Sequence, residues 1–167
     1  MGGSALNLSI NQYAYIIKYL LDKRLAVILT GTGERESTIN QTLIESQSEE
    51  NKNFIVNAVD RFSLREFAII VSMSRLFIGP STGPTHLANS VDTPLISFYP
   101  PIQVQSATRW QPYHAESSVF TPQVKCGQKY KCLGEKCQYY YCMDKIDDSA
   151  IIDAIEDVLR TKARNLS

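Results

Sequence analysis

The stretch RLFIGPSTGPTHLANSVDTPLISFY, residues 75–99, holds two apolar runs with a turn and a short helical segment between them. The apolar runs lie at 75–79 and 93–99, and their length and composition are typical of buried strands. Pro84 suits the first turn of a helix, where its missing N–H is not needed, and we expect a short helix over 83–91. The stretch therefore predicts a strand–helix–strand unit, which joins neighbouring parallel strands.

The chain before this stretch repeats the alternation. Apolar runs at 25–30 and 53–59 predict two more strands, and apolar residues at helical spacing predict a helix over 11–24. A turn at 31–37 leads into a modest helix that ends near Ser46. Strands and helices therefore alternate over the first hundred residues.

Two further helices have clear signals. Ser63 followed three residues later by Glu66 is a capping box, which predicts a helix over 63–74. The segment 147–164 has one apolar face, with acidic residues leading and basic residues trailing, and we expect a C-terminal helix there. Strands separated by helices imply right-handed crossovers, so we expect an α/β fold, a Rossmann-like three-layer domain with a parallel sheet. Ligands of such sheets bind beyond the carboxyl ends of the strands.

The length and charge of the chain limit the classes of protein to which it can belong. Its 167 residues suit one compact domain, which we expect over 9–167, after an expression tag or disordered start at 1–8. Basic and acidic residues both number 17, so no net basic field exists to attract nucleic acid. No apolar run approaches the roughly 20 residues of a transmembrane helix, and the start has no export signal, so we expect a cytoplasmic protein.

The turn GPSTGPTH, residues 79–86, follows a predicted strand and opens a predicted helix. Gly83 lets a ligand approach the backbone closely, and free amides of Thr85 and His86 at the helix start would form an anion site. The ring of His86 would add an N–H donor. Hydroxyl donors would come from Ser81, Thr82 and Thr85. The same residues also suit a purely structural turn, in which Ser and Thr cap the helix.

The turn GTGER, residues 31–35, follows another predicted strand. It matches neither the dinucleotide-binding GxGxxG pattern nor the P-loop. It is either a flexible strand-to-helix connection or a second wall of the same cleft. In the second case, Glu34 or Glu36 would accept hydrogen bonds from ribose hydroxyls.

All four cysteines of the chain lie in one irregular segment, 122–145, which precedes the last helix. They are Cys126, Cys132, Cys137 and Cys142. Zinc is possible, but its ligands usually come in closer pairs, so the spacing fits only partly. Disulfides are a second option, and reduced thiols that pack an irregular loop are slightly favoured over both.

The same segment contains lysines and tyrosines in close succession. They are Lys125, Lys129, Lys131, Lys136, Tyr130, Tyr139, Tyr140 and Tyr141. This basic and aromatic patch would suit an anionic lipid or a saccharide acceptor. An ordinary solvated loop is the favoured interpretation.

Three elements in this order resemble glycosyltransferase family 9, the ADP-heptose:lipopolysaccharide heptosyltransferase family. The elements are SLREFAIIVSMSRLFIG at 63–79, the motif STGPTHLA at 81–88 with Pro94 after it, and CMDKI at 142–146. The resemblance covers the chain from about residue 9 to residue 160. It implies the GT-B arrangement, in which two Rossmann-like domains face each other, and this chain resembles the C-terminal, donor-binding half.

The resemblance also implies a donor site. It places the diphosphate at Thr82, Gly83 and His86, and His86 would stabilise the departing diphosphate. Glu36 would lie near the ribose or the sugar, and Phe62 would line the adenine pocket. The implied donor-binding residues are Thr30, Gly31, Thr32, Gly33, Glu36, Phe62, Ser81, Thr82, Gly83, Pro84, Thr85 and His86. In many heptosyltransferases, the position of Ser81 holds an acidic residue that contacts the donor sugar. The serine here therefore bears on which sugar the donor carries.

The reaction implied is an inverting, metal-independent transfer from a nucleotide-sugar, with an ADP-heptose-like donor, in lipopolysaccharide or surface-glycan synthesis. No cofactor is required. The acceptor, a saccharide or lipid-linked molecule, would bind an N-terminal domain that also carries the catalytic base. The chain alone would then be an inactive fragment, located in the cytoplasm or peripherally at the inner face of the inner membrane.

Two alternatives remain at this point. One is a fragment of a GT-B-type sugar epimerase, against which CMDKI at 142–146 argues. The other is a non-catalytic α/β module that uses the cysteine segment as a zinc-held interaction surface.

Overall fold

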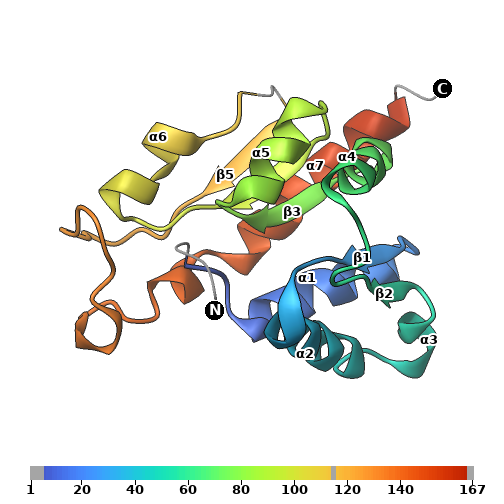
Figure 1. The fold of residues 1–167 in the computed structure, drawn as a ribbon, viewed down its shortest axis with the longest axis horizontal. Coiled ribbons are helices and arrows are strands. Elements are labelled where there is room, and N and C mark those ends of the chain that lie inside the picture. Colours follow the sequence, from blue (N-terminus) through green and yellow to red (C-terminus); the bar gives the residue numbers. More distant parts are fainter. Residues whose placement is uncertain (1–5, 114–115, 165–167) are drawn as a thin grey trace. The chain divides into compact units, whose positions relative to one another are not determined.

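The computed structural model of the chain describes residues 6–113 and 116–164 (Figure 1). The described residues form two compact units, one of Ser9–Phe67 and a second that runs from Ala68 onward and takes in the residues just before Ser9. The expectation of a single domain over 9–167 stays a prediction. The start at 1–8 lies mostly outside the described residues.

The first unit alternates helices and parallel strands. It contains α1 (Ile10–Asp22), β1 (Val27–Leu29), α2 (Gly33–Glu45), α3 (Glu49–Lys52) and β2 (Ile55–Asn57). The strands pair in parallel, with Val27 opposite Ile55. Ile17 and Leu21 of α1, Leu43 of α2 and Ile55 of β2 form one buried apolar cluster. The predicted helices and strands of this unit are therefore confirmed, with boundaries shifted by a few residues.

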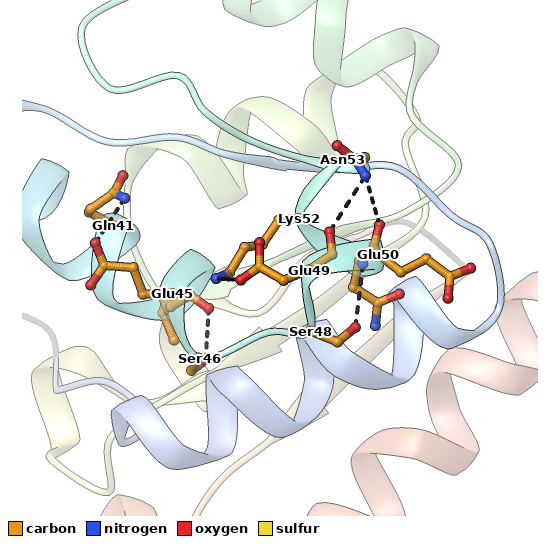
Figure 2. Close-up of polar contacts among 10 residues, drawn as sticks. Gln41, Glu45, Ser46, Ser48, Glu49, Glu50, Lys52 and Asn53 are labelled. Carbon is orange, nitrogen blue, oxygen red and sulfur yellow. Dashed lines mark hydrogen bonds and ion pairs between the residues drawn. The ribbon is translucent and has the colours of Figure 1, made fainter.

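The short helix α3 was not predicted. Ser48 accepts a hydrogen bond from the amide of Asn51 at 3.4 Å, and Lys52 pairs with Glu49 at 2.6 Å (Figure 2). These polar, local bonds hold the helix, and none of its residues is buried. Apolar periodicity has no signal for such an element.

The second unit is built on a three-stranded parallel sheet with the order β3-β4-β5. The strands are β3 (Phe77–Pro80), β4 (Leu95–Phe98) and β5 (Ser117–Phe120), and every residue of the central β4 is buried. Its helices are α5 (Gly83–Ser90), α6 (Ala107–Trp110) and α7 (Asp148–Arg164), with 3-10 turns at Gln103–Gln105, Gly134–Lys136 and Cys142–Lys145. Helix α4 (Leu64–Met73) begins in the first unit and ends in the second. Helix α5 packs on β3 and β4, α7 packs on β4, and Figure 1 shows α5 and α7 on opposite faces of this sheet.

Two features of the sheets differ from the sequence expectation. The strand pairings of the described residues fall into two sheets, β1-β2 and β3-β4-β5, although every pairing is parallel as predicted. The fifth strand, β5, was not predicted. Its sequence SSVF is short and half polar, and only its pairing with β4, Leu95 opposite Ser117, makes it a strand. No described helix combines the length and apolar character that crossing a membrane requires.

The capping box at the start of α4 is confirmed. The hydroxyl and amide of Ser63 donate to one carboxylate oxygen of Glu66 at 2.7 and 2.8 Å, and the amide of Glu66 donates back to the Ser63 hydroxyl at 3.4 Å. These bonds to Ser63 hold the pKa of Glu66 below its usual value.

Acidification is expected to weaken this helix start. Because the folded chain favours the carboxylate of Glu66, its stabilisation is present at neutral pH and is lost as the pH falls through the lowered pKa. Urea unfolding of the wild type and of Glu66→Ala should show a difference in the free energy of unfolding at neutral pH. That difference should shrink at about pH 3, below the ordinary carboxyl range. An equal difference at both pH values would contradict the assignment.

Candidate functional site

The turn after β3 lies at the carboxyl end of the sheet of the second unit. The amide of Ser81 donates to the carbonyl of Phe98 at 3.0 Å, so the β3-β4 ladder continues into the turn. Thr82 has an extended backbone, with φ −139° and ψ 175°, and is the N-cap of α5. Pro84 lies in the first turn of the helix, as predicted. The chain is thus turned sharply from strand to helix at the edge where parallel sheets bind ligands.

A buried hydroxyl holds the turn together. Thr85 is fully buried, and its hydroxyl donates to the carbonyl of Pro80 at 2.5 Å. The hydroxyl of Thr82 makes a longer contact with the same carbonyl, at 3.4 Å. The Thr85 hydroxyl, expected to face a ligand, is therefore used inside the turn and fixes its shape.

The backbone donors of the turn also differ from the expectation. The amides of Thr85 and His86 both donate to the carbonyl of Thr82, at 3.1 and 3.4 Å. The prediction that these two amides are free was therefore wrong. The first turn closes with an i to i+3 bond, which satisfies amides that a regular α-helix start leaves open. The amide of Gly83 donates no hydrogen bond within the described part of the chain. Gly83 is exposed, and a Cβ there would meet no atom within 4 Å.

His86 is exposed on the first turn of α5, and its ring packs against an aromatic side chain from α6. The ring centroids of His86 and Trp110 lie 5.8 Å apart at an interplanar angle of 58°. The indole N–H of Trp110 donates to the carbonyl of Val104 at 2.9 Å, and the guanidinium of Arg109 lies 5.3 Å from the indole ring. Trp110 is thus held in place and in turn restricts the imidazole. The sequence gives no signal for this partner, because no periodicity links residues 86 and 110.

Buried polar side chains lie behind the turn. The hydroxyl of Tyr99, a fully buried residue, donates to the carbonyl of Trp110 at 2.6 Å. Burial raises the pKa of Tyr99, while the nearby hydroxyls of Ser81 and Ser97 act in the opposite direction. Ser97 is fully buried, and its Oγ meets no hydrogen-bond partner among the described residues. The carboxyl end of β4 therefore carries a neutral phenol and hydroxyls under the His86 turn.

The GTGER turn differs from the GPSTGPTH turn because carboxylates, rather than hydroxyls and an imidazole, surround its backbone amides. The amide of Thr32 donates to the carboxylate of Glu36 at 2.8 Å, and the amide of Gly33 donates to the carboxylate of Asp60 at 2.9 Å. The Asp60 amide returns a bond to the carbonyl of Gly31 at 3.1 Å. Two carboxylates thus occupy the N-terminus of α2, where an external anion would otherwise bind. The sequence pattern pointed to Glu36 but not to Asp60, which lies 27 residues after Gly33.

The first unit contains three other residues that the sequence analysis placed in the site, Thr30, Glu34 and Phe62. The carbonyl of Thr30 accepts a hydrogen bond from the buried Asn40 at 3.4 Å. Glu34 is exposed, and Phe62 is half-buried just before the capped helix α4. The GTGER turn and the GPSTGPTH turn belong to different units. The expectation that they line one cleft stays a prediction.

The four cysteines are free thiols, so the structure does not contain the disulfides considered above. Cys132 and Cys137 each accept a hydrogen bond to sulfur from a backbone amide two residues later, at 3.3 and 3.4 Å. Burial raises the pKa of the Cys142 thiol, and the charges of the other three cysteines raise it further. Within residues 6–113 and 116–164, no group of three or more His, Cys, Asp or Glu side chains is disposed to hold a metal ion.

Comparison with known proteins gives consistent matches. The pattern of glycosyltransferase family 9 (heptosyltransferase) matches residues 8–141. A Haemophilus influenzae protein named "Putative glycosyltransferase" is 36% identical over 118 residues, which are 66% of this chain and 31% of that protein.

Two solved structures share the fold. The structure of E. coli ADP-heptose LPS heptosyltransferase II matches 96% of this chain and 44% of its own, with a TM-score of 0.78 and 16% identity. E. coli heptosyltransferase WaaC with ADP matches 95% of this chain and 42% of its own, with a TM-score of 0.69 and 15% identity. The chain thus spans less than half the length of each of these relatives. Because the family pattern covers most of its residues, the chain belongs to glycosyltransferase family 9, the heptosyltransferase family.

Proposed function

We propose that the chain is the donor-binding part of an inverting, metal-independent glycosyltransferase whose donor is an ADP-sugar, with ADP-heptose or a similar sugar as the first candidate. The observation that carries the proposal is the start of α5, where the amide of the exposed Gly83 donates no hydrogen bond within the described residues and the His86 imidazole packs against Trp110. A helix N-terminus with a free amide and a ring N–H is a suitable anion site. The family and the ADP in the WaaC structure support a nucleoside diphosphate as that anion.

In the proposed reaction, an acceptor oxygen attacks the anomeric carbon of the donor. The bond from that carbon to the diphosphate oxygen breaks, the configuration inverts, and a base takes the acceptor proton. Negative charge then develops on the departing nucleoside diphosphate. The Gly83 amide, the positive end of α5 and His86 would stabilise this charge, which is the work a metal ion does in other transferases.

Four residues around the turn would shape the site rather than supply charge. Pro84 and Thr85 hold the geometry of the first helical turn, and Thr82 and Ser81 place hydroxyls beside it. Ser81 stands where an acidic side chain would contact the sugar, so the donor sugar would differ in the hydrogen bonds that it offers there.

The turn of the first unit would recognise the nucleoside. The backbone of the turn leads into the start of α2 through Gly31, Thr32 and Gly33. The carboxylate of Glu36 keeps free lone pairs after it accepts one hydrogen bond from the amide of Thr32. Ribose hydroxyls are donors that match such an acceptor. Phe62 would stack on the adenine, and Thr30 would extend the same surface.

The partners of the reaction would come from outside this chain. We propose that a second, acceptor-binding domain supplies the catalytic base and binds a saccharide or lipid-linked acceptor in lipopolysaccharide or surface-glycan synthesis. The chain alone would then bind donor without turnover. We place this activity in the cytoplasm. Family membership favours this proposal over the epimerase and the non-catalytic module.

Calorimetric titration with ADP, UDP and GDP in the presence of EDTA tests the proposal. We expect ADP to bind, UDP and GDP to bind much more weakly, and added Mg²⁺ to leave the ADP affinity unchanged. Gly83→Val should abolish ADP binding without unfolding the chain, because no atom lies within 4 Å of the new Cβ. Gly127→Val is the matched control, since its surroundings are equally open. A folded chain that binds none of the three nucleotides would contradict the proposal.

A further inference from the structure

The cysteine segment carries a surface that the donor site does not use. A shallow hollow of about 600 Å³ is lined by Gln128, Lys129, Tyr130, Lys131, Cys132, Leu133 and Lys136. We call it the Lys–Tyr hollow. Its two large apolar side chains are unusually open to solvent, Tyr130 at 68% and Leu133 at 51%. Tyr141, which follows in the same segment, is exposed at 70%.

The charge of this segment stands out in a neutral chain. Residues 125–141 contain four lysines and one acidic residue, Glu135, so the segment carries a net charge of +3 while the whole chain carries zero. Three of the lysines line the Lys–Tyr hollow and are exposed. Lys129 lies 5.1 Å from the ring of Tyr130, and no ion pair among the described residues neutralises Lys129, Lys131 or Lys136. The positive charge is therefore free to meet an external anion.

Exposed apolar tips between unpaired lysines match the physical structure of a lipid interface. Lysine stems lie along apolar material while their ammonium groups reach phosphates, and tyrosine is favoured at the headgroup level. A neutral saccharide would use the tyrosine but would gain nothing from three lysines. A nucleic acid would need a larger basic field than three charges supply.

We propose that the Lys–Tyr hollow docks the chain on an anionic phospholipid surface. Lys129, Lys131 and Lys136 contact headgroup phosphates, and Tyr130 and Leu133 enter the interfacial layer. Each lysine near such a surface is expected to raise the affinity about fivefold, so the three together supply about a hundredfold. This inference goes beyond the proposed donor site and shares none of its residues, so either can fail without the other.

Vesicle sedimentation of the full chain tests the proposal. We expect binding to vesicles of phosphatidylcholine with about 30% phosphatidylglycerol, weak binding to pure phosphatidylcholine, and loss of binding as the salt concentration rises. The triple variant Lys129→Glu, Lys131→Glu, Lys136→Glu should lose at least a hundredfold in partitioning. Tyr130→Ser with Leu133→Ser should weaken binding at moderate salt while keeping the salt dependence.

A charge-matched control separates the surface from net charge. Arg35→Glu, Arg65→Glu, Arg75→Glu makes the same change in net charge at exposed positions elsewhere, and should keep vesicle binding within a few-fold of the wild type. Equal losses in both triple variants would overturn the proposal, as would equal binding to both kinds of vesicle or to neither. Complete competition by millimolar inorganic phosphate would assign the hollow to free phosphate and also overturn it. Circular dichroism checks that each variant is folded.

Discussion

Ile155→Ala is expected to lower the free energy of unfolding of the second unit by about 2–5 kcal/mol, the usual effect of removing a fully buried large aliphatic side chain. Ile155 and Ile151 are both fully buried on α7, and this helix packs on β4. The alanine would leave a cavity against the central strand, where the rigid sheet limits relaxation.

Urea unfolding followed by circular dichroism measures this loss. The matched control is Ile69→Ala on α4, because Ile69 is 53% exposed and its truncation removes little buried surface. We expect that control to change the free energy of unfolding by less than about 1 kcal/mol. Similar losses at both positions would contradict the view that α7 seals the core of this sheet.

His86→Ala is expected to weaken ADP binding by roughly ten- to a hundredfold, which corresponds to losing a hydrogen bond to a charged group, about 1.5–3 kcal/mol. The fold should be unaffected, since His86 is an exposed residue. Calorimetric titration gives the affinity, and urea unfolding gives the stability of the same variant. Unchanged ADP affinity would remove His86 from the proposed diphosphate site.

Variants of the neighbouring ring refine this prediction. Trp110→Phe keeps an aromatic ring near the imidazole and should retain most of the ADP affinity, whereas Trp110→Ala removes the packing at 5.8 Å and should weaken it. In the His86→Ala background, Trp110→Ala should have little further effect, because the ring that it positions is absent. Independent, additive losses would mean that Trp110 acts on the ligand by another route.

Local signals in the sequence predicted much of this fold. Apolar runs marked β1 to β4, and a pair of residues three apart, Ser63 and Glu66, marked the start of α4. The ordered motifs indicated the family, because they preserve both residue types and spacing. Prediction succeeded where the determining residues are close together in the chain.

Prediction from the sequence failed where a feature depends on a residue far away along the chain. Strand β5 exists because β4 offers it a ladder, and Asp60 reaches the start of α2 across 27 residues. The donors of the GPSTGPTH turn were misplaced for a finer reason. A tight first turn closes the amides of Thr85 and His86 on Thr82 and leaves Gly83 open, a choice that residue types alone do not determine.

The two carboxylates at the start of α2 have a consequence for selectivity among nucleotides. Glu36 and Asp60 already compensate the partial positive charge of that helix end, and both are exposed acids. If the donor binds as proposed, a ribose with free hydroxyl groups would meet acceptors there, whereas a ribose carrying its own phosphate group would meet like charge. The turn would therefore reject adenine nucleotides phosphorylated at the 2′ or 3′ position, which share their base and diphosphate with the proposed donor. The turn would then select the proposed donor by repelling the phosphorylated nucleotides, without a further contact to the donor itself.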